Sequence, residues 1–174
     1  KLKDLGCNNY KMRIGHQDLN TDILRIKEAI SVFGNDNSVI VDLIEGTLKS
    51  SYDEKTLKKI FNELNKFNFN WVEEPIEPSE MNKLLFIKSI SKNSIATGEA
   101  YSGLTHFKNL LNPNYIDIIQ YDYTHSGDFN TCFEISKIAK RNNIDQVLHV
   151  WGSSLALHSN AIFSLKKLNF LKYP

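Results

Sequence analysis

Short apolar runs alternate with helical patterns along this sequence, and one run with its helix takes roughly 25 to 30 residues, the size of a β-strand–α-helix unit. The runs predict seven strands, at residues 10–15, 38–44, 71–75, 94–99, 115–122, 145–152 and 169–173. Helices are predicted between them, at residues 21–34, 52–67, 81–90, 104–111, 129–142 and 153–165. Because a single helix joins each pair of successive strands, the strands are expected to form a parallel sheet.

A TIM-type (β/α) barrel and an open, doubly wound sheet both fit this alternation, and the polar residues separate them. In six of the seven units an ionisable residue lies on the strand or at its C-terminal end: Lys11 and Arg13, Asp42, Glu73, Glu99, Asp122 and His149. In a barrel these strand ends meet at one mouth, where active sites lie, whereas an open sheet would spread them along an edge. No glycine-rich phosphate loop follows any of the strands. We therefore expect one domain over residues 1–174, a partial barrel of about seven parallel strands.

Composition excludes several classes of partner. The chain has 174 residues and a net charge of +1, which points to neither nucleic acid nor a membrane. No apolar run reaches the roughly 20 residues that span a bilayer, and the N-terminus has no signal-peptide pattern. Cys7 and Cys132 are interpreted as reduced, buried thiols of a cytoplasmic protein.

The sequence starts without Met and stops as an apolar strand begins, so we expect a partial chain. The exposed sheet edges of a partial barrel favour a homo-oligomer.

Three carboxylates, Asp42, Glu73 and Glu99, end successive predicted strands. Carboxylates that converge on one mouth repel one another, and a hard divalent cation such as Mg²⁺ removes that repulsion. A helix cap or a loop charge explains one such residue better than three in consecutive units. Glu74 is the alternative to Glu73 as a metal ligand, because neighbouring residues on a strand point in opposite directions and only one of them can face the mouth. We take Glu73 as the metal ligand and Glu74 as a supporting residue.

Basic residues and histidines supply candidates for proton transfer. Lys11 and Arg13 are two residues apart on one strand, so they face the same side. Lys11 serves as a general base if its pKa is lowered, whereas Arg13 stays protonated and suits binding or orienting a carboxylate. Asp122 and His149 close two successive strands, and a carboxylate beside a histidine fixes its tautomer and raises its basicity. Isolated strand charges, or a histidine that only packs in the core, are the simpler interpretations.

Two more residues lie close to these strand ends. His125 follows the predicted strand that ends at Asp122 and is a candidate to line the mouth. Trp151 follows His149 and is either an apolar wall of the substrate pocket or part of the core.

Read in order, these motifs resemble the enolase superfamily, in its mandelate racemase and acid-sugar dehydratase branch. The matching pieces are YKMRIG for the basic strand, VIVD, WVEEP and ATGEAYS for three metal ligands, DIIQYD for the aspartate and LHVWGSS for the histidine. The match runs from about residue 10 to the end of the chain. WVEEP, ATGE and HVWGS are each weak signals, but in this order they are together highly specific.

The resemblance implies a chemistry and a role for each matching residue. Enolase-superfamily sites abstract a proton α to a carboxylate and use Mg²⁺ to stabilise the enediolate that forms. By this likeness, Asp42, Glu73 and Glu99 bind Mg²⁺, Lys11 neutralises the substrate carboxylate, and His149, oriented by Asp122, is the base or acid. The implied reaction is dehydration of a sugar acid, with racemisation or epimerisation as the alternative. The substrate-binding candidates are Lys172, Trp151, His125 and Glu45.

The chain departs from the family pattern in places that bear on this reading. Arg13 replaces the usual second lysine, which favours a one-base dehydratase over a two-base racemase. Ile44 stands where the family usually has Asn, and Lys172 where the last strand usually ends in glutamate. The family's capping domain and first barrel strand are also expected to be missing. A second hypothesis is therefore a diverged barrel that binds metal without catalysis and acts as an interaction module, and a third is an unrelated open-sheet binding protein.

Overall fold

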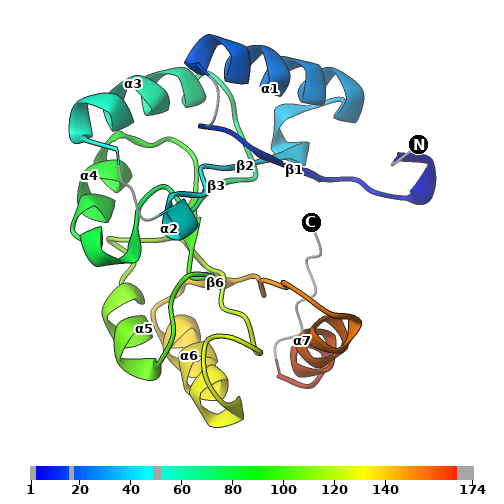
Figure 1. Ribbon diagram of the computed structural model, residues 1–174, viewed down its shortest axis with the longest axis vertical. Coiled ribbons are helices and arrows are strands. Elements are labelled where there is room, and N and C mark those ends of the chain that lie inside the picture. The colour runs from blue at the N-terminus through cyan, green and yellow to red at the C-terminus, as the bar shows by residue number, and fades with distance from the viewer. Residues whose placement is uncertain (1–2, 16–17, 49–51, 168–174) are drawn as a thin grey trace. The chain divides into compact units, whose positions relative to one another are not determined.

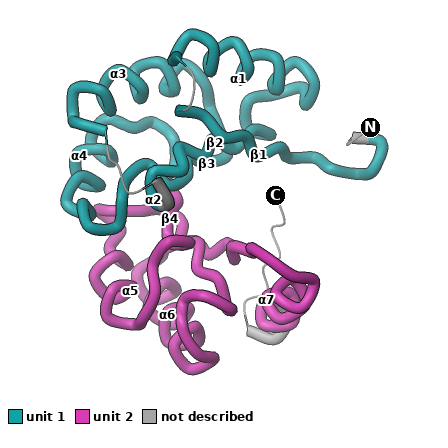
Figure 2. The backbone as a smooth tube through the Cα atoms, viewed as in Figure 1, with its two compact units in different colours: residues 1–95, 174 teal, residues 96–173 magenta. Residues whose placement is uncertain are grey.

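The computed structural model describes residues 3–15, 18–48 and 52–167 (Figure 1). The chain divides into two compact units, one that runs to Ile95 and one that starts at Ala96 (Figure 2). Each unit is a run of strands and helices in alternation, and each is described below by itself.

The first unit contains strands β1 to β3 and the helices that follow them. Its elements, in chain order, are β1 (Tyr10–Arg13), α1 (Leu19–Phe33), β2 (Val39–Asp42), α2 (Glu45–Leu48), α3 (Glu54–Leu64), β3 (Trp71–Glu73) and α4 (Lys83–Ile90). Short 3₁₀ turns occur at Lys3–Leu5, Asp36–Ser38 and Pro78–Glu80. The strands are parallel, and their register places Arg13 opposite Asp42, and Asp42 opposite Glu73. Strand ends that are adjacent in this way bring their terminal side chains to one edge.

Local sequence explains where these elements begin and end. All four residues of β2 are buried, as expected for a strand in a parallel sheet covered on both faces. The Asp18 carboxylate caps α1 by accepting from two backbone N–H groups, and Gly34 ends the helix in the left-handed region with φ 93°. Asp53 caps α3, which buries one apolar face.

The second unit repeats the same plan. Its elements are β4 (Ile95–Thr97), which begins at the boundary, α5 (Leu104–Leu110), β5 (Ile118–Ile119), α6 (Phe129–Arg141), β6 (Asp145–Gln146) and α7 (Ser154–Lys167). β4 pairs with β5 and β5 with β6, in both cases in parallel. The buried Tyr121 ring packs edge-on against Phe107 and Phe163, with centroids 6.4 and 6.3 Å away.

Gly98 is a glycine whose missing side chain shapes the candidate site. It follows β4 with φ 141°, and a Cβ there would lie 2.9 Å from the Ile119 side chain and 3.0 Å from the backbone of Gln120. Only glycine permits this close approach of the two strand ends. The approach fixes the backbone immediately before Glu99.

Most of the predicted elements are confirmed, with boundaries shifted by a few residues. Six of the seven predicted strands are present and parallel, while the predicted strand at 169–173 lies outside the described residues. The short helix α2 was not predicted, since its four residues are too few to show a helical period. Cys132 is buried as predicted, but the prediction for Cys7 is wrong: it is exposed, because it lies in the segment before β1. Within the described ranges, no helix is long and apolar enough to cross a lipid bilayer.

Candidate active site

In the first unit, the adjacent ends of β1, β2 and β3 bring four of the predicted site residues together. Lys11 Nζ lies 2.6 Å from Glu73 Oε1 and 3.7 Å from Asp42 Oδ2. Arg13 Nε lies 3.6 Å from the same Asp42 oxygen. Asp42 and Glu73 are almost completely buried, and the Lys11 side chain is 30% exposed. The prediction that Lys11 and Arg13 face the same side is confirmed, and that side carries the carboxylates.

The two carboxylates are oriented by neutral donors as well as by these cations. The backbone N–H of Ile44 donates to Asp42 Oδ1 at 2.8 Å, and the Trp71 indole donates to Glu73 Oε2 at 2.9 Å. The oxygens left on the other side, Asp42 Oδ2 and Glu73 Oε1, are the ones that face Lys11. This geometry presents one oxygen from each of two buried carboxylates to a positive charge. Carboxylate oxygens are also the donors that Mg²⁺ prefers, so this pair fits a hard cation.

The backbone turns sharply where β2 and β3 end. Ile44 and Glu74 both adopt positive φ, at 54° and 47°. A β-branched residue such as isoleucine is a true outlier in this region, whereas the asparagine usual in the family tolerates it. The turns are linked by a hydrogen bond from the Glu45 N–H to the Glu74 carbonyl, 3.0 Å long. Strand β3 ends at Glu73, so Glu74 lies outside it, and the alternation of strand side chains does not decide which of the two glutamates faces the site. Both side chains are buried.

Glu45, a substrate-binding candidate, begins α2 with its side chain buried. Burial raises the pKa of its carboxyl to about 7, and the positive charge of Lys83 opposes this only in part. The Lys83 ammonium itself donates to the backbone carbonyl of Tyr52 and to the Glu80 carboxylate. Glu45 is therefore a buried acid whose carboxyl keeps its proton to a higher pH than an exposed glutamate does.

In the second unit, His149 lies between two carboxylates. Its Nδ1 is 3.4 Å from Asp122 Oδ2, and its Nε2 is 3.0 Å from Glu99 Oε2. The side chains of His149 and Glu99 are 15% and 11% exposed, so both are shielded but reachable. The predicted pairing of Asp122 with His149 therefore exists in the folded unit, although the two residues are 27 positions apart in the sequence.

Asp122 is held by a dense set of hydrogen bonds. Its Oδ1 accepts from the Thr124 N–H, the Thr124 hydroxyl and the Asn160 amide, and its Oδ2 accepts from the Trp151 N–H. Burial alone would raise the pKa of this carboxyl, but hydrogen bonds from His149, Thr124 and Asn160 outweigh burial and hold the pKa well below its usual range. Asp122 is therefore ionised at neutral pH, which favours a proton on the His149 nitrogen that faces it.

The remaining predicted residues have mixed outcomes. The Trp151 side chain is 71% exposed, so the core alternative is wrong, and the alternative of a pocket wall stays a prediction. Its loop lies beyond β6, and its backbone N–H donates to Asp122. The His125 side chain is exposed, and its backbone bonds to Asp122 and Ser102. Lys172 lies outside the described residues.

Sequence reasoning missed the residues that hold Asp122, namely Thr124, Ser126 and Asn160. Ser126 and Thr124 follow the aspartate directly and form a local turn with it. Asn160 lies on α7. It is a polar residue at a buried position of that predicted helix, and this was the one feature of the sequence that could have pointed to it.

The three residues predicted to be metal ligands are divided between the units. The first unit provides Asp42 and Glu73, and the second provides Glu99. Within the residues that the structure describes, no three His, Cys, Asp or Glu side chains form a group that could hold a metal ion. The fit to a cation thus rests on the Asp42–Glu73 pair and on the oxygen donors that it presents.

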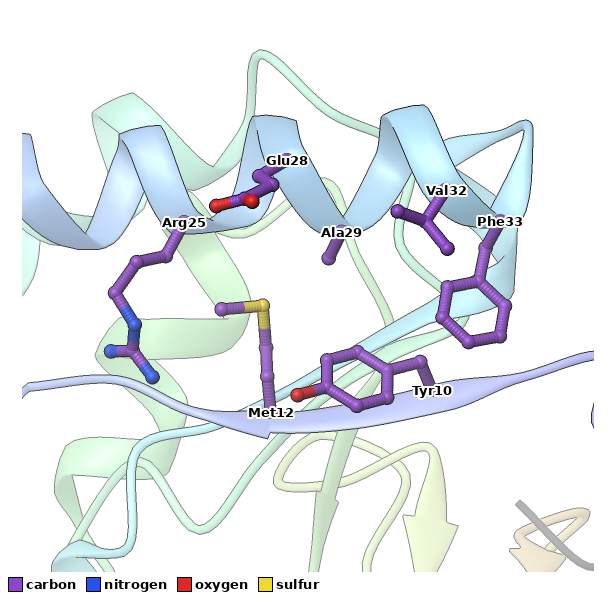
Figure 3. A pocket seen from close by; sticks show the side chains of 7 residues that line it. All are labelled: Tyr10, Met12, Arg25, Glu28, Ala29, Val32 and Phe33. Atoms are coloured by element: carbon purple, nitrogen blue, oxygen red, sulfur yellow. The ribbon is translucent and has the colours of Figure 1, made fainter. Parts of the chain in front are cut away.

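A pocket of about 290 Å³ lies elsewhere in the first unit, between β1 and α1 (Figure 3). Tyr10, Met12 and Phe33 are among the side chains that line it, and the Tyr10 and Phe33 rings stack with centroids 5.3 Å apart. Lys11 and Arg13 alternate with Tyr10 and Met12 along β1 and are not among its lining residues, so this pocket is on the opposite side of the strand from the carboxylates.

Known proteins resemble this chain over nearly its whole length. The family model described as "Enolase C-terminal domain-like" matches residues 1–173. The L-talarate/galactarate dehydratase of Salmonella typhimurium is 21% identical over 164 residues, which cover 94% of this chain and 40% of that enzyme. The chain thus spans less than half the length of this relative.

Solved structures show the same fold. The 3,6-anhydro-D-galactonate cycloisomerase from Zobellia galactanivorans superposes with a TM-score of 0.84 at 25% identity, over 97% of this chain and 46% of that one. The L-talarate dehydratase from Polaromonas sp. JS666, solved in complex with Mg and L-glucarate, has a TM-score of 0.76 at 20% identity, over 86% of this chain and 41% of that one. The α/β architecture described above is accordingly that of a partial TIM-type barrel, as predicted.

Proposed function

The chain belongs to the enolase C-terminal domain-like family, and we propose that it carries the proton-transfer site of an acid-sugar dehydratase. Relatives in this family include dehydratases and cycloisomerases of sugar acids, which supports a reaction that begins by removing the proton α to a carboxylate. The observation that carries the proposal is His149, held between Asp122 and Glu99.

His149 is the proposed base, and once it is protonated it is the proposed acid. Because ionised Asp122 accepts from the Nδ1 side, Nε2 is the nitrogen that exchanges a proton with substrate. A carboxylate partner of a catalytic histidine keeps a proton on one ring nitrogen, so that proton exchange with substrate takes place on the other. Nε2 lies 3.0 Å from Oε2 of Glu99, a proposed metal ligand, so the nitrogen that exchanges the proton is beside that carboxylate.

The first unit provides the proposed charge stabilisation. Asp42 and Glu73, with Glu99, would hold Mg²⁺, which when bound neutralises negative charge that develops on the substrate carboxylate. Lys11 already lies against both first-unit carboxylates and would contribute its positive charge to the same carboxylate group of the substrate. Arg13, which remains protonated, would orient that carboxylate.

The proposed reaction is a β-elimination. His149 takes the α-proton, the C–H electrons form the carbon–carbon double bond, and the β-hydroxyl leaves as water with the proton that His149 then returns. The enol that remains tautomerises to a 2-keto-3-deoxy sugar acid. Arg13 in place of a second basic lysine favours this one-base reaction over racemisation, which needs a base on each face of the α-carbon.

A metal-binding module without catalysis is the second candidate, and Ile44 is the observation that favours it. The turn after Asp42 has a left-handed backbone at Ile44, with φ 54°, although isoleucine disfavours that conformation, so the loop beside the proposed metal is strained.

Screening the natural polypeptide against sugar acids with Mg²⁺ tests the proposal, with two readouts: formation of a 2-keto acid and exchange of the α-proton in D₂O by NMR. We expect turnover of at least one acid in wild type and loss of both signals in His149→Asn. Turnover that survives His149→Asn would refute the assignment of the base. Thermal stabilisation by Mg²⁺ that is lost in Asp42→Ala, with no turnover or exchange for any acid, would leave the non-catalytic module as the better description.

A further inference from the structure

Asn160 connects helix α7 to the carboxylate of Asp122. Its amide donates to Asp122 Oδ1 at 3.0 Å and to the Ala156 carbonyl at 3.0 Å. Its own carbonyl oxygen accepts from the Tyr123 N–H at 2.9 Å. The residue is 2% exposed, so both ends of the amide are satisfied inside the second unit and its orientation is determined.

These contacts decide which oxygen of Asp122 faces the histidine. Oδ1 takes three donors, two from Thr124 and one from Asn160. With Oδ1 fixed, the plane of the carboxylate is fixed, and Oδ2 is left toward His149 Nδ1 and the Trp151 N–H. The Thr124 donors come from the turn that contains Asp122 itself, whereas Asn160 is 38 residues away. Asn160 thus anchors the turn to a separate element, helix α7.

We propose that Asn160 is a positioning residue that sets the orientation of Asp122 toward His149, by linking the loop after β5 to helix α7. The inference rests on the proposed function, in which His149 transfers the proton. Asn160 touches neither substrate nor reacting atoms and acts through Asp122.

The energetics of the site support a role beyond packing. A buried amide inside a helix costs free energy unless its hydrogen bonds are made, and an apolar residue would fill the same space without that demand. Three bonds from one amide, one of them to an ionised carboxylate, are what offset the cost here. Losing the bond to Asp122 frees the carboxylate to rotate about the Thr124 contacts, and the imidazole loses the partner that fixes its tautomer.

Replacement of Asn160 by leucine, which has a similar size and no polar group, is the first test. We expect kcat to fall by about 10- to 100-fold with KM nearly unchanged, because misplacement of a proton-transfer group by a fraction of an ångström slows chemistry rather than binding. Ser164→Ala is the matched control, since Ser164 lies one turn further along α7 and is equally buried. It is expected to leave kcat unchanged.

A second variant and a second readout guard against a variant that simply unfolds. Asn160→Ala removes the donor to Asp122 without placing a second carboxyl group beside it and suits the helix, so it should lower kcat in the same range while circular dichroism stays native. The ¹⁵N shifts of the His149 ring, measured without substrate, should show a proton on Nδ1 in wild type and Ser164→Ala, and a tautomer mixture in both Asn160 variants.

The outcomes separate this inference from the proposed function. If His149→Asn abolishes turnover but a folded Asn160 variant keeps wild-type kcat and the wild-type tautomer, Asn160 is only structural and the inference is overturned. If turnover survives His149→Asn, the proposed function fails, and the ring ¹⁵N shifts alone then decide whether Asn160 positions the Asp122–His149 pair.

Discussion

The two units hold their carboxylates by different means. In the first unit, Asp42 and Glu73 face charged groups, the Lys11 ammonium above all, and the Arg13 guanidinium contacts Asp42. In the second, Asp122 is held by hydrogen-bond donors from neutral groups, and its neighbour His149 is charged only when it takes a proton. A carboxylate balanced by a fixed cation is suited to exchanging that cation for another charged group. A carboxylate satisfied by neutral donors stays ionised and is suited to orienting a histidine.

The largest expected effect lies in the second unit. His149→Asn removes the proposed base while it keeps a polar side chain of similar reach. Rates of α-proton exchange should fall by about 10²- to 10⁴-fold, the usual contribution of a general base. NMR of the substrate in D₂O measures this, with His158→Asn as a control on an exposed histidine of the same unit. Equal losses in the two variants would contradict the special role of His149.

The second largest expected effect is a loss of stability, caused by a substitution in the first unit. Lys11→Met removes the cation that contacts both buried carboxylates and leaves Arg13 beside Asp42, which costs about 3 kcal/mol, at the low end for a broken buried pair because Lys11 is partly exposed. Chemical denaturation measures this loss. Millimolar Mg²⁺ should restore much of the stability if the Asp42–Glu73 pair accepts a hard cation.

A matched control for Lys11 is Lys66→Met, which breaks a surface pair with Glu63 on α3. It should cost less than about 1 kcal/mol and should not respond to Mg²⁺. A Lys11 variant that is no less stable than the Lys66 variant would show that the cation is not required. Failure of Mg²⁺ to restore stability would argue against the metal site itself.

The contrast between the units also marks what the sequence could predict. Asp42, Glu73 and Glu99 were identifiable because each follows a buried strand after one repeat, and the ends of parallel strands meet at one edge. Lys11 and Arg13 were placed on one side by the two-residue period of a strand, and the structure confirms this. Periodicity thus sufficed for residues whose position depends on regular elements.

Periodicity in the sequence did not predict the residues that are positioned by loops and by distant side chains. No short-range pattern links Asn160 to Asp122, since their contact depends on how α7 packs against the loop after β5. The exposure of Trp151 likewise follows from the path of the chain beyond β6 and not from its hydrophobicity. The left-handed backbone at Ile44 was unpredictable for an opposite reason, because isoleucine disfavours the conformation that it adopts.

Glu45 extends the comparison, because it is an acid of the first unit whose burial outweighs the opposing charge of Lys83 and raises its pKa to about 7. The folded state binds this proton more tightly than the unfolded chain, so the stability that Glu45 contributes is fully present below about pH 4.5 and is lost as pH rises through about 7. Glu45→Gln should abolish this fall and make the protein more stable than wild type at pH 8, by about 2 kcal/mol.

Denaturation curves at pH 5 to 8 measure the effect, with Glu54→Gln, at an exposed position of α3, as control. The control should follow the wild-type curve. If wild type and Glu45→Gln show parallel pH dependence, another group accounts for the titration.

The smallest expected effect concerns the strained turn beside Asp42. Ile44→Asn should stabilise the protein by about 1 kcal/mol, because asparagine adopts the left-handed region with less strain than a β-branched residue. The backbone N–H that donates to Asp42 is kept, so the carboxylate should stay oriented. Asn143→Gly is the matched control: Asn143 has φ 55°, almost the same as Ile44, but its residue type already suits the conformation, so the gain should be smaller. If Ile44→Asn instead destabilises the protein, the apolar contacts of the isoleucine side chain outweigh the strain, and the first unit holds Asp42 by packing as well as by charge.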